Sequence, residues 1–521
     1  MKKKGIVWTI LAAIVFLVVT AATAGLLVKV AGLNILPEKY LGLVIAAVVF
    51  VLLIIFLLFF VFPIKKKTED AAEAQVVKKP IGKYVIRTIA MLLAVTLLAG
   101  DVLGIQMVNE FEDAMSNLVD DDKNEQVKVE EFVIGVYVRA EDKAVDLEAA
   151  KRYDFGYSLS YDRNNVRRGI SEIESTLDRK LDAVEYNDIF EMVDKVLAKE
   201  LDAFILSEAY LDILEDQEGY GDISSKIKCI HKCVVTVETP IVEKEEAPFD
   251  ITKDTFIIYV SGHDTNYAAK RANSDVNILA VVNPSTKQVL LINTPRDSYV
   301  PISVSETGAL DKLTHCGVYG VQCSMDTLGD LYDIDINYYA QLNFVGFKRL
   351  VDALGGIEVY SEKEIYTTNE GIHFVKGVNY VNGEQALAFV RERKKYGSDR
   401  YRGKHQMAVI KGIIGKMSSG ALLTNYSEIL ASMGTYFKTS VSQEELATIV
   451  KMQLNDLASW NVQMYAVDGT GDSQTSYSLP NLKTYVMRLN QATVDHAKTL
   501  IEMVYDGKII EESDLKVPTQ Q

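Results

Sequence analysis

The chain has little cysteine and no excess of positive charge, and both shortages narrow its possible functions. It contains four cysteines in 521 residues, too few for the disulfide framework that holds many small secreted domains together. Lysine and arginine number 55 against 71 acidic residues, so the formal net charge is −16. Because a nucleic-acid-binding surface needs a broad basic footprint, we expect no nucleic acid among the partners.

The cysteines occur as two close pairs, which leaves local bridges open. Cys229 lies near Cys233 and Cys316 near Cys323, so two local disulfides could form in an oxidising compartment. The alternation of Cys229, His231 and Cys233 also suggests a metal site. Alternate residues of one strand seldom complete a zinc site, and no second ligand pair is evident, so strand packing is the favoured interpretation.

Apolar residues are concentrated at the start of the chain, in three stretches of membrane-spanning length. Residues 6–28 and 41–62 are uncharged runs. The third stretch, 84–108, contains Arg87 and Asp101 near its ends, where charged side chains can reach the headgroup region. A cleaved signal peptide is the alternative for the first run, but its apolar core is too long and a second span follows directly.

The lysines around these spans predict the orientation of the chain. Lys2, Lys3 and Lys4 precede the first span, and the short loop 34–40 carries only Lys39. Six more lie between the second and third spans: Lys65, Lys66, Lys67, Lys78, Lys79 and Lys83. Positively charged loops stay in the cytoplasm, so we expect a multi-pass membrane protein with a cytoplasmic N-terminus and extracellular domains after residue 108. Without the third span these domains would be cytoplasmic.

Beyond the membrane region (1–108), the pattern predicts two soluble α/β domains. Residues 109–129 are acidic and polar and are expected to form a linker. Residues 130–240 alternate strand-like and helical segments, which predicts a small accessory α/β domain with partly parallel strands. Its stretch KELDAFILSEAYLDIL loosely resembles one lobe of an extracellular solute-binding protein, and its ligand is unknown. Residues 250–512 form the second domain, including its C-terminal part.

The second domain opens with a predicted strand and hairpin. Residues 255–260 favour a strand, and 278–282 and 289–292 favour two further strands joined by the turn 283–287. Further along, the spacing of apolar residues and the turn residues predict helices at 341–354, 384–390, 443–456 and 492–505, strands at 357–360 and 462–467, and a glycine-rich loop at 469–471.

Acidic residues gather at the open end of this hairpin. Asp275 precedes its first strand, and Arg296 and Asp297 follow its second. Asp264, which leaves the preceding strand, can join them. Two carboxylates at adjacent strand ends are a usual means of holding Mg²⁺ or Mn²⁺, and the alternative is that these aspartates cap turns.

A dense cationic cluster lies between two apolar helical runs late in the chain. The segment 390–406, VRERKKYGSDRYRGKHQ, follows the run 384–390 and leads into the run 407–414. Arginine side chains match phosphate oxygens two at a time, so several that converge would need a multiply charged anion such as a pyrophosphate. A solvated basic surface is the alternative.

The ordered motifs of the second domain resemble the LytR-CpsA-Psr family of cell-envelope phosphotransferases. They are SGHDTNYAAKRANSDVNILAVVNPSTKQVLLINTPRDSYV, DKLTHCGVYG, LVDALGGIEV, VNGEQALAFVRER and GSDRYRGKHQ. The resemblance runs from about residue 256 to 415 and leaves the accessory domain uncovered. It implies an α/β catalytic domain whose central mixed sheet is flanked by helices.

The resemblance also implies an activity. Family members move a glycopolymer, such as a wall teichoic acid or capsular polysaccharide, from a polyprenyl (pyro)phosphate lipid onto peptidoglycan at the outer membrane face of Gram-positive cells. An apolar pocket holds the lipid tail, while arginines and a magnesium ion, or manganese in its place, hold the head group. Two other functions remain open: hydrolysis of a polyprenyl pyrophosphate, and non-catalytic binding of lipid phosphate in a regulatory protein.

The resemblance assigns roles to individual residues. Asp264 and Asp275 match the metal-associated acids, Arg296 matches a pyrophosphate-binding arginine, and Asp297 is expected to orient it. The remaining assignments are Lys312 and Gln406 for substrate binding, Arg391 and Arg393 for substrate binding and catalysis, and Asp399 and Arg402 for catalysis. His405 departs from the family pattern, where an arginine or asparagine is common, and is expected to soften the charge around the head group. Asp275 or Asp399 is expected to accept the proton of the attacking hydroxyl, directly or through water.

Overall fold

Three long apolar helices occupy the N-terminal region. They are α1 (Lys2–Gly32), α2 (Glu38–Phe56), which a π-helical turn extends to Val61, and α3 (Ile81–Leu118). Their apolar stretches are Val7–Gly32, Glu38–Val61 and Val85–Leu118; an 18-residue segment within each has a mean hydropathy of 2.6, 3.6 and 2.1, respectively, and each stretch is long enough to cross a membrane. The chain therefore carries three candidate membrane spans. They include the stretch predicted as the third span, 84–108, which lies within α3.

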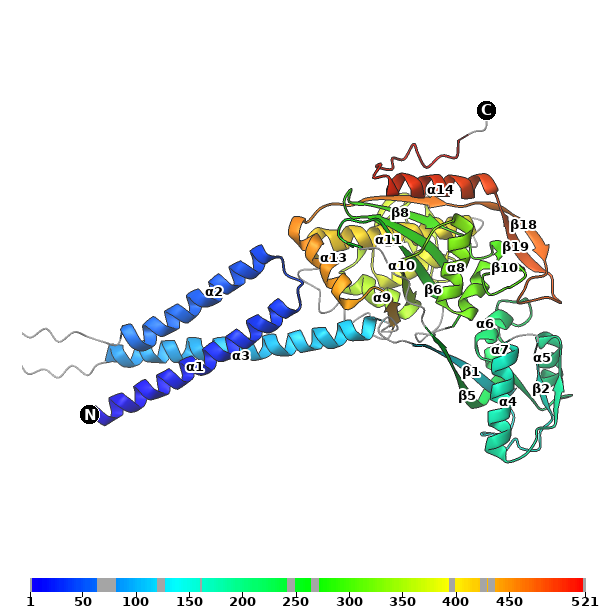
Figure 1. The fold of residues 1–521 in the computed structure, drawn as a ribbon, viewed down its shortest axis with the longest axis horizontal. Helices are drawn as coiled ribbons and strands as arrows, with labels where there is room; N and C mark the ends of the chain where they lie inside the picture. Colours follow the sequence, from blue (N-terminus) through cyan, green and yellow to red (C-terminus); the bar gives the residue numbers. More distant parts are fainter. Residues whose placement is uncertain are drawn as a thin grey trace, which may run out of the picture. The chain divides into compact units, whose positions relative to one another are not determined.

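The computed structural model describes residues 2–62, 81–119, 127–159, 162–240, 249–263, 271–392, 399–421, 429 and 436–518. They form two units, each with its own internal contacts. One comprises the N-terminal helices together with α13 (Gln443–Asp456), and the other comprises the accessory domain and the second α/β domain, called the catalytic domain for the activity that its resemblance implies. Figure 1 shows the elements of each unit.

Asp101, one of the charged residues of the third span, is buried between helices instead of reaching toward a headgroup. Its residue exposure is 3%, and its carboxylate accepts a hydrogen bond of 2.6 Å from the Thr23 hydroxyl of α1. A polar group in an apolar helix bundle is costly unless it has such a partner. The expectation for Asp101 was therefore wrong, because the sequence of α3 does not reveal which residue of α1 faces it.

The predicted linker 109–129 is shorter than expected. Helix α3 continues to Leu118, and strand β1 begins at Val127. Phe111, Met115 and Leu118 follow one another at helical spacing and are all buried, which accounts for the continuation of the helix through an acidic stretch.

The accessory domain is a five-stranded sheet with helices, and its strand order is β3-β2-β4-β1-β5. Strand β2 is parallel to β3 and β4, and β1 is antiparallel to β4 and β5. The predicted partly parallel α/β arrangement is confirmed. The elements are β1 (Val127–Arg139), β2 (Phe155–Tyr157), α4 (Arg163–Leu177), β3 (Ala183–Glu185), α5 (Ile189–Leu197), β4 (Ala203–Ser207), α6 (Ala209–Glu215), α7 (Ile223–Lys226) and β5 (Ile227–Pro240).

The catalytic domain is built on a mixed six-stranded sheet of order β16-β11-β6-β7-β8-β17. The predicted hairpin is present as β7 and β8, and it lies at the centre of this sheet, with β6 antiparallel to β7 and β17 parallel to β8. The sheet consists of β6 (Phe256–His263), β7 (Val276–Asn283), β8 (Gln288–Asn293), β11 (Tyr338–Asn343), β16 (Phe437–Thr439) and β17 (Asn461–Ala466).

Helices cover both faces of this sheet, as predicted for the fold class. On one face Leu279 and Ile292 pack against α8 (Val321–Tyr332) and α14 (Gln491–Tyr505), and Figure 1 shows α14 beside β8. On the other face Ile278 and Leu291 pack against Met407 of α11 (Asp399–Lys416). Alternate residues of each strand thus fill two separate cores.

The remaining elements complete the catalytic domain around the sheet. They are β9 (Tyr299–Pro301), β10 (Leu310–Lys312), the 3-10 helix η3 (Leu313–Tyr319), α9 (Phe344–Ala353), β12 (Ile357–Ser361), β13 (Ile365–Tyr366), β14 (His373–Phe374), β15 (Gly377–Val381), α10 (Gly383–Arg391), the π-helical turn η4 (Met417–Ala421), β18 (Gly469–Gln474) and β19 (Thr484–Leu489).

Two predicted elements of the catalytic domain differ from the structure. Residues 341–343 belong to β11, and α9 starts at Phe344 because the Asn343 side chain caps it by accepting from the Gly346 N–H at 2.8 Å. The predicted loop 469–471 begins strand β18, which pairs with β19 so closely that a Cβ at Gly469 would lie 2.3 Å from the Arg488 carbonyl oxygen. Glycine there permits strand pairing.

All four cysteines are free thiols in the structure, so neither local bridge is formed. Cys229 is exposed on β5, whereas Cys233, Cys316 and Cys323 are buried. Among the described residues, no group of three His, Cys, Asp or Glu side chains could hold a metal ion. Cys229, His231 and Cys233 therefore do not form such a group.

His405 lies in the core of the domain and does not line the pocket that Arg402 and Gln406 line. Its ring stacks on Phe389 of α10, with centroids 4.1 Å apart, and its residue exposure is 7%. One step along a helix turns the side chain by about 100°, so residue 405 points to a different side of α11 from Gln406. The expectation that it softens charge around the head group was wrong. Burial lowers the pKa of His405 to about 4.

We predict that His405 makes folding sensitive to mildly acidic pH. In the unfolded chain His405 binds a proton below its ordinary pKa of about 6.5. In the folded chain it binds this proton only below about pH 4. The unfolding free energy should therefore fall with decreasing pH across this window, by up to about 1.4 kcal/mol per pH unit from this group. His405→Phe keeps the ring on Phe389 and should remove that part of the slope.

The measurement compares thermal unfolding midpoints of the two detergent-solubilised proteins between pH 4 and 7, followed by tyrosine circular dichroism. Other titrating groups are common to both proteins and cancel in the difference. If the unfolding midpoint changes with pH equally in the wild type and in His405→Phe, the prediction is contradicted.

Candidate functional site

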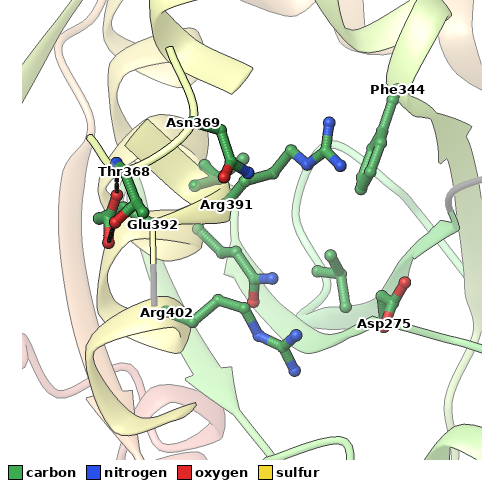
Figure 2. A pocket seen from close by; sticks show the side chains of 10 residues that line it. Asp275, Phe344, Thr368, Asn369, Arg391, Glu392 and Arg402 are labelled. Carbon is green, nitrogen blue, oxygen red and sulfur yellow. Dashed lines mark hydrogen bonds between the residues drawn. The ribbon is translucent and has the colours of Figure 1, made fainter. Parts of the chain in front are cut away.

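A pocket of about 250 Å³ opens where the start of β7 faces the ends of three helices. Asp275 and Val276 come from the sheet, Phe344 begins α9, and Arg391 ends α10. Figure 2 shows the side chains that line it. Among the described residues, those that line the pocket are Asp275, Val276, Phe344, Thr368, Asn369, Val390, Arg391, Glu392, Arg402 and Gln406.

The positions of α10 and α11 deliver the basic residues to this pocket. Helix α10 begins at a capping box in which Asn382 and Gln385 satisfy each other's backbone N–H groups. Helix α11 approaches β8 so closely that a Cβ at Gly403 would lie 2.2 Å from the Asn293 side-chain oxygen. A larger residue at 403 would push the helix away from the sheet, so this glycine sets the depth at which the neighbouring Arg402 enters the pocket.

Two arginines of the predicted cluster point into the pocket. The Arg391 guanidinium lies over the Phe344 ring at 5.3 Å, and Arg391 is exposed, whereas Arg402 is only 5% exposed. Figure 2 shows both side chains directed into the cavity, with Asp275 on the opposite side. Gln406 follows Arg402 by one helical turn on the same face of α11 and also lines the cavity. The pocket thus has a basic wall and an acidic wall.

The acidic wall is tied to the end of the hairpin by an ion pair. Arg296 Nη1 donates to Asp275 Oδ1 at 2.6 Å. Asp216 Oδ2 lies 3.4 Å from the same nitrogen, and Asp297 Oδ2 lies 3.9 Å from Nε. Burial alone would lower the pKa of Arg296, but these three carboxylates outweigh it and raise the pKa above its ordinary value. Arg296 is therefore charged.

Lys312 and Asp297 form the next layer behind this pair. Lys312 Nζ lies 3.7 Å from Asp297 Oδ1, and both residues are buried. The backbone at Lys312 is fixed by Asp311, whose Oδ1 accepts from the Lys312 N–H at 2.7 Å and contacts His315 Nδ1 at 2.7 Å. Burial would raise the pKa of Asp311, but His315 and the surrounding hydrogen bonds lower it overall.

Several pocket residues were not assigned from the sequence. Glu392 is 6% exposed, and its carboxylate accepts from the Thr368 N–H at 2.5 Å and from the Thr368 hydroxyl at 3.0 Å. This contact fixes the loop that brings Asn369 to the cavity, and Figure 2 shows it. The position of Glu392 between Arg391 and Arg393 could have indicated from the sequence that it belongs to the site. Thr368 and Asn369, in the loop after β13, could not be identified in this way, because the loop reaches the pocket only through tertiary packing.

Of the ten predicted site residues, the structure brings five together at the pocket, places Asp297 and Lys312 in the layer behind its acidic wall, and leaves three undecided. Asp275, Arg296, Arg391, Arg402 and Gln406 surround the pocket or contact its wall. Asp264 and Arg393 lie outside the described residues, and Asp399 is the first residue of α11, without a described side chain.

Two described carboxylates line the pocket: Asp275, which faces the basic residues, and Glu392, whose oxygens accept hydrogen bonds from Thr368. No group of three His, Cys, Asp or Glu side chains among the described residues could enclose a metal ion. Mg²⁺ commonly binds through one or two carboxylates and completes its shell with water and phosphate oxygens. The donor set therefore fits an ion of that kind and does not fit one with a complete protein cage.

Comparison with known proteins gives matches over the same region. The sequence model of the LytR_cpsA_psr family matches residues 226–495, so the match begins at the last residue of α7, directly before β5 and earlier than the predicted boundary at 250. The chain is 34% identical over 263 residues to the polyisoprenyl-teichoic acid–peptidoglycan teichoic acid transferase TagU of Enterococcus faecalis, covering 50% of this chain and 83% of that protein. It is 30% identical over 261 residues to TagT of Bacillus subtilis, covering 48% and 77%.

Solved structures also match. One is described as TagT bound to LI-WTA, with 27% identity, a TM-score of 0.41, and coverage of 52% of this chain and 94% of that chain. Another is B. subtilis TagV, with 22% identity, a TM-score of 0.42, and coverage of 50% and 99%. The sequence matches to the family and to TagU establish the relationship: the chain belongs to the LytR_cpsA_psr family.

Proposed function

We propose that this protein transfers a glycopolymer from a polyprenyl (pyro)phosphate carrier onto peptidoglycan at the outer face of the membrane. The observation that carries the proposal is the pocket in which Arg391 and Arg402 face Asp275. The names of the relatives TagU and TagT, which describe transfer of polyisoprenyl-linked teichoic acid to peptidoglycan, support the same reaction.

The proposed reaction is a single displacement at phosphorus. A sugar hydroxyl of peptidoglycan attacks the phosphorus atom that bears the polymer. The new P–O bond joins polymer to peptidoglycan, and the pyrophosphate P–O bond breaks to release lipid monophosphate. The hydroxyl proton passes to a carboxylate, Asp275 or Asp399, directly or through water.

The cations of the pocket act on the charge that this displacement creates. Negative charge grows on the bridging and leaving oxygens, so donors fixed beside them stabilise the transition state more than the ground state. Arg402, nearly buried, is suited to hold the phosphate in place, and the exposed Arg391 is suited to meet it at the mouth. Arg296, charged and paired with Asp275, adds a positive charge beside the acidic wall.

We also propose a divalent ion, Mg²⁺ or Mn²⁺, held by Asp275 and Asp264. When bound, such an ion neutralises phosphate charge and helps to orient the two reacting groups. In this arrangement Arg296 keeps the Asp275 carboxylate oriented toward the pocket. It also limits the charge that Asp275 presents when no ion is bound.

Removing one pocket arginine should slow transfer strongly. For Arg391→Gln or Arg402→Gln we expect a loss of roughly 2–4 kcal/mol of transition-state stabilisation, which is about 30- to 800-fold in rate. The assay follows attachment of a lipid-linked polymer to peptidoglycan fragments and release of lipid monophosphate.

Arg349→Gln is the matched control, because Arg349 is an exposed arginine of α9 that contacts Tyr436 outside the pocket. Full activity of both pocket variants would refute the assigned roles. Release of lipid phosphate by the wild type without polymer attachment would instead identify a hydrolase, and binding without either product a non-catalytic protein.

The metal proposal predicts loss of ion binding on removal of Asp275. Chelation should abolish transfer, and added Mg²⁺ or Mn²⁺ should restore it. Asp275→Asn should weaken Mn²⁺ binding by about 10-fold or more, measured by electron paramagnetic resonance without substrate. Asp330→Asn, at an exposed acid of α8, is the control. Unchanged Mn²⁺ affinity in Asp275→Asn would remove Asp275 from the metal site.

We further propose a cytoplasmic N-terminus and extracellular soluble domains, on the strength of the lysine pattern and three candidate spans. Cys229 offers a native probe, since it is the one exposed cysteine among the four. Partial burial raises the pKa of its thiol, so labelling is best done at about pH 8.5.

In intact cells a membrane-impermeant maleimide should label the wild type and not Cys229→Ser. Labelling only after the membrane is permeabilised would place the soluble domains in the cytoplasm and would contradict the proposed orientation.

A further inference from the structure

Helix α6 of the accessory domain lies directly behind the segment that carries Asp275. The Asn273 backbone N–H donates to Asp212 Oδ2 at 3.2 Å. The Asn273 side-chain amide donates to the Asp212 carbonyl oxygen at 3.2 Å and to Asp216 Oδ2 at 3.1 Å. Asn273 is 7% exposed and precedes Asp275 by two residues. The accessory domain therefore holds the approach to the acidic wall through three hydrogen bonds.

Asp216 also reaches the guanidinium that anchors this wall. Its carboxylate lies 3.4 Å from Arg296 Nη1, the nitrogen that binds Asp275 at 2.6 Å. Arg296 Nε is buried without a hydrogen-bond partner, and Asp297 lies 3.9 Å from it. Among the described residues no hydrogen bond to Nη2 is present. Two carboxylates from different domains thus fix one corner of the guanidinium plane.

The position of α6 is itself set by the interface between the two domains. Ile213 and Leu214 belong to a buried apolar cluster that also includes Val318 and Leu479 of the catalytic domain. The hydroxyls of Tyr210 and Tyr319 lie 3.2 Å apart across the same interface. Such a packed apolar core resists small shifts, so Asp216, the residue directly after α6, has a defined place beside Arg296.

Asp212 and Asp216 make different contacts. Burial raises the pKa of Asp212 to about 7, and the nearby Glu215, Asp216 and Asp275 add to the effect. Near neutral pH the Asp212 carboxyl is therefore partly protonated. It serves mainly to accept from Asn273, whereas Asp216 is the accessory-domain acid in contact with Arg296.

We propose that Asp216 is a positioning residue of the transfer site, supplied by the accessory domain. Together with Asp275 it fixes the Arg296 guanidinium so that the remaining nitrogen, Nη2, is presented to the pyrophosphate of the lipid carrier. This proposal rests on the proposed function for the identity of the ligand. The accessory domain then completes the site for its lipid substrate, and this role does not depend on a separate ligand of its own.

An opposite role for the same contact makes an opposite prediction. If Asp216 occupied Arg296 in place of a phosphate, its removal would free the guanidinium and strengthen binding of a pyrophosphate. If it positions the guanidinium, its removal weakens binding. The pairing of Arg296 Nη1 with Asp275 at 2.6 Å favours positioning, because that nitrogen is engaged whether or not Asp216 is present.

The test is a double-mutant cycle on the full-length protein in detergent, with geranylgeranyl pyrophosphate as the binding probe. Asp216→Asn should weaken binding by about 3- to 30-fold in the wild type and by less than about 2-fold in an Arg296→Lys background. Asp216→Glu should recover part of the loss. Glu218→Gln, at an exposed acid two positions further on, should bind as the wild type does.

The four proteins of the cycle (the wild type, Asp216→Asn, Arg296→Lys and the double variant) are then assayed for polymer transfer. This assay separates the positioning role of Asp216 from the proposed transfer function. Equal effects of Asp216→Asn in both backgrounds, or tighter binding by Asp216→Asn, would overturn the positioning role while leaving transfer intact. Probe binding with the expected coupling but no transfer by the wild type would overturn the proposed function alone. A wild type that neither binds the probe nor transfers polymer would overturn both.

Discussion

The ion pair between Asp275 and Arg296 is the interaction on which the site depends. Both residues lie at the open end of the β7–β8 hairpin, whose register places Ile278 opposite Asn293. Past that point the Thr294 N–H donates to the Asn277 carbonyl at 3.0 Å, so the two chains stay together as they leave the sheet. A partly buried arginine and carboxylate would each be costly alone, and their pairing fixes both orientations at the edge of the pocket.

The opposite wall depends on packing and much less on charge. Met407 of α11 fills the core against Leu291 on one face of the sheet, and Gly403 lets the same helix approach Asn293. Arg402 therefore enters the pocket at a depth set by apolar contacts one turn away. The open end of the β7–β8 hairpin carries the Asp275–Arg296 pair, and one face of the same hairpin packs against α11, which carries Arg402. The two strands therefore help to set the distance between Asp275 and Arg402.

Features set by neighbouring residues in the sequence were predictable. The hairpin, the helix after Asn382 and the arginine cluster follow from turn residues, capping and charge pattern, and the structure contains the hairpin and the helix as predicted. Features set by distant partners were missed. Asp101 accepts a hydrogen bond from Thr23, and Glu392 accepts one from Thr368. The start of β18 pairs with β19, which follows it in the chain. His405 was misassigned because its neighbours in sequence face the pocket while its own ring faces Phe389.

The two walls have different chemistry, and this asymmetry sets how a phosphate ester would lie under the proposed function. Arg391 and Arg402 offer several N–H donors and no acceptor, so they favour the non-bridging phosphate oxygens. Asp275 repels those oxygens unless a cation intervenes, yet it can accept a proton from a hydroxyl. A pyrophosphate is therefore expected to lie along the arginine wall, with the attacking hydroxyl approaching from the side of Asp275. Arg296 makes this arrangement workable, because it pairs with Asp275 and offsets its charge while Asp275 still lines the pocket.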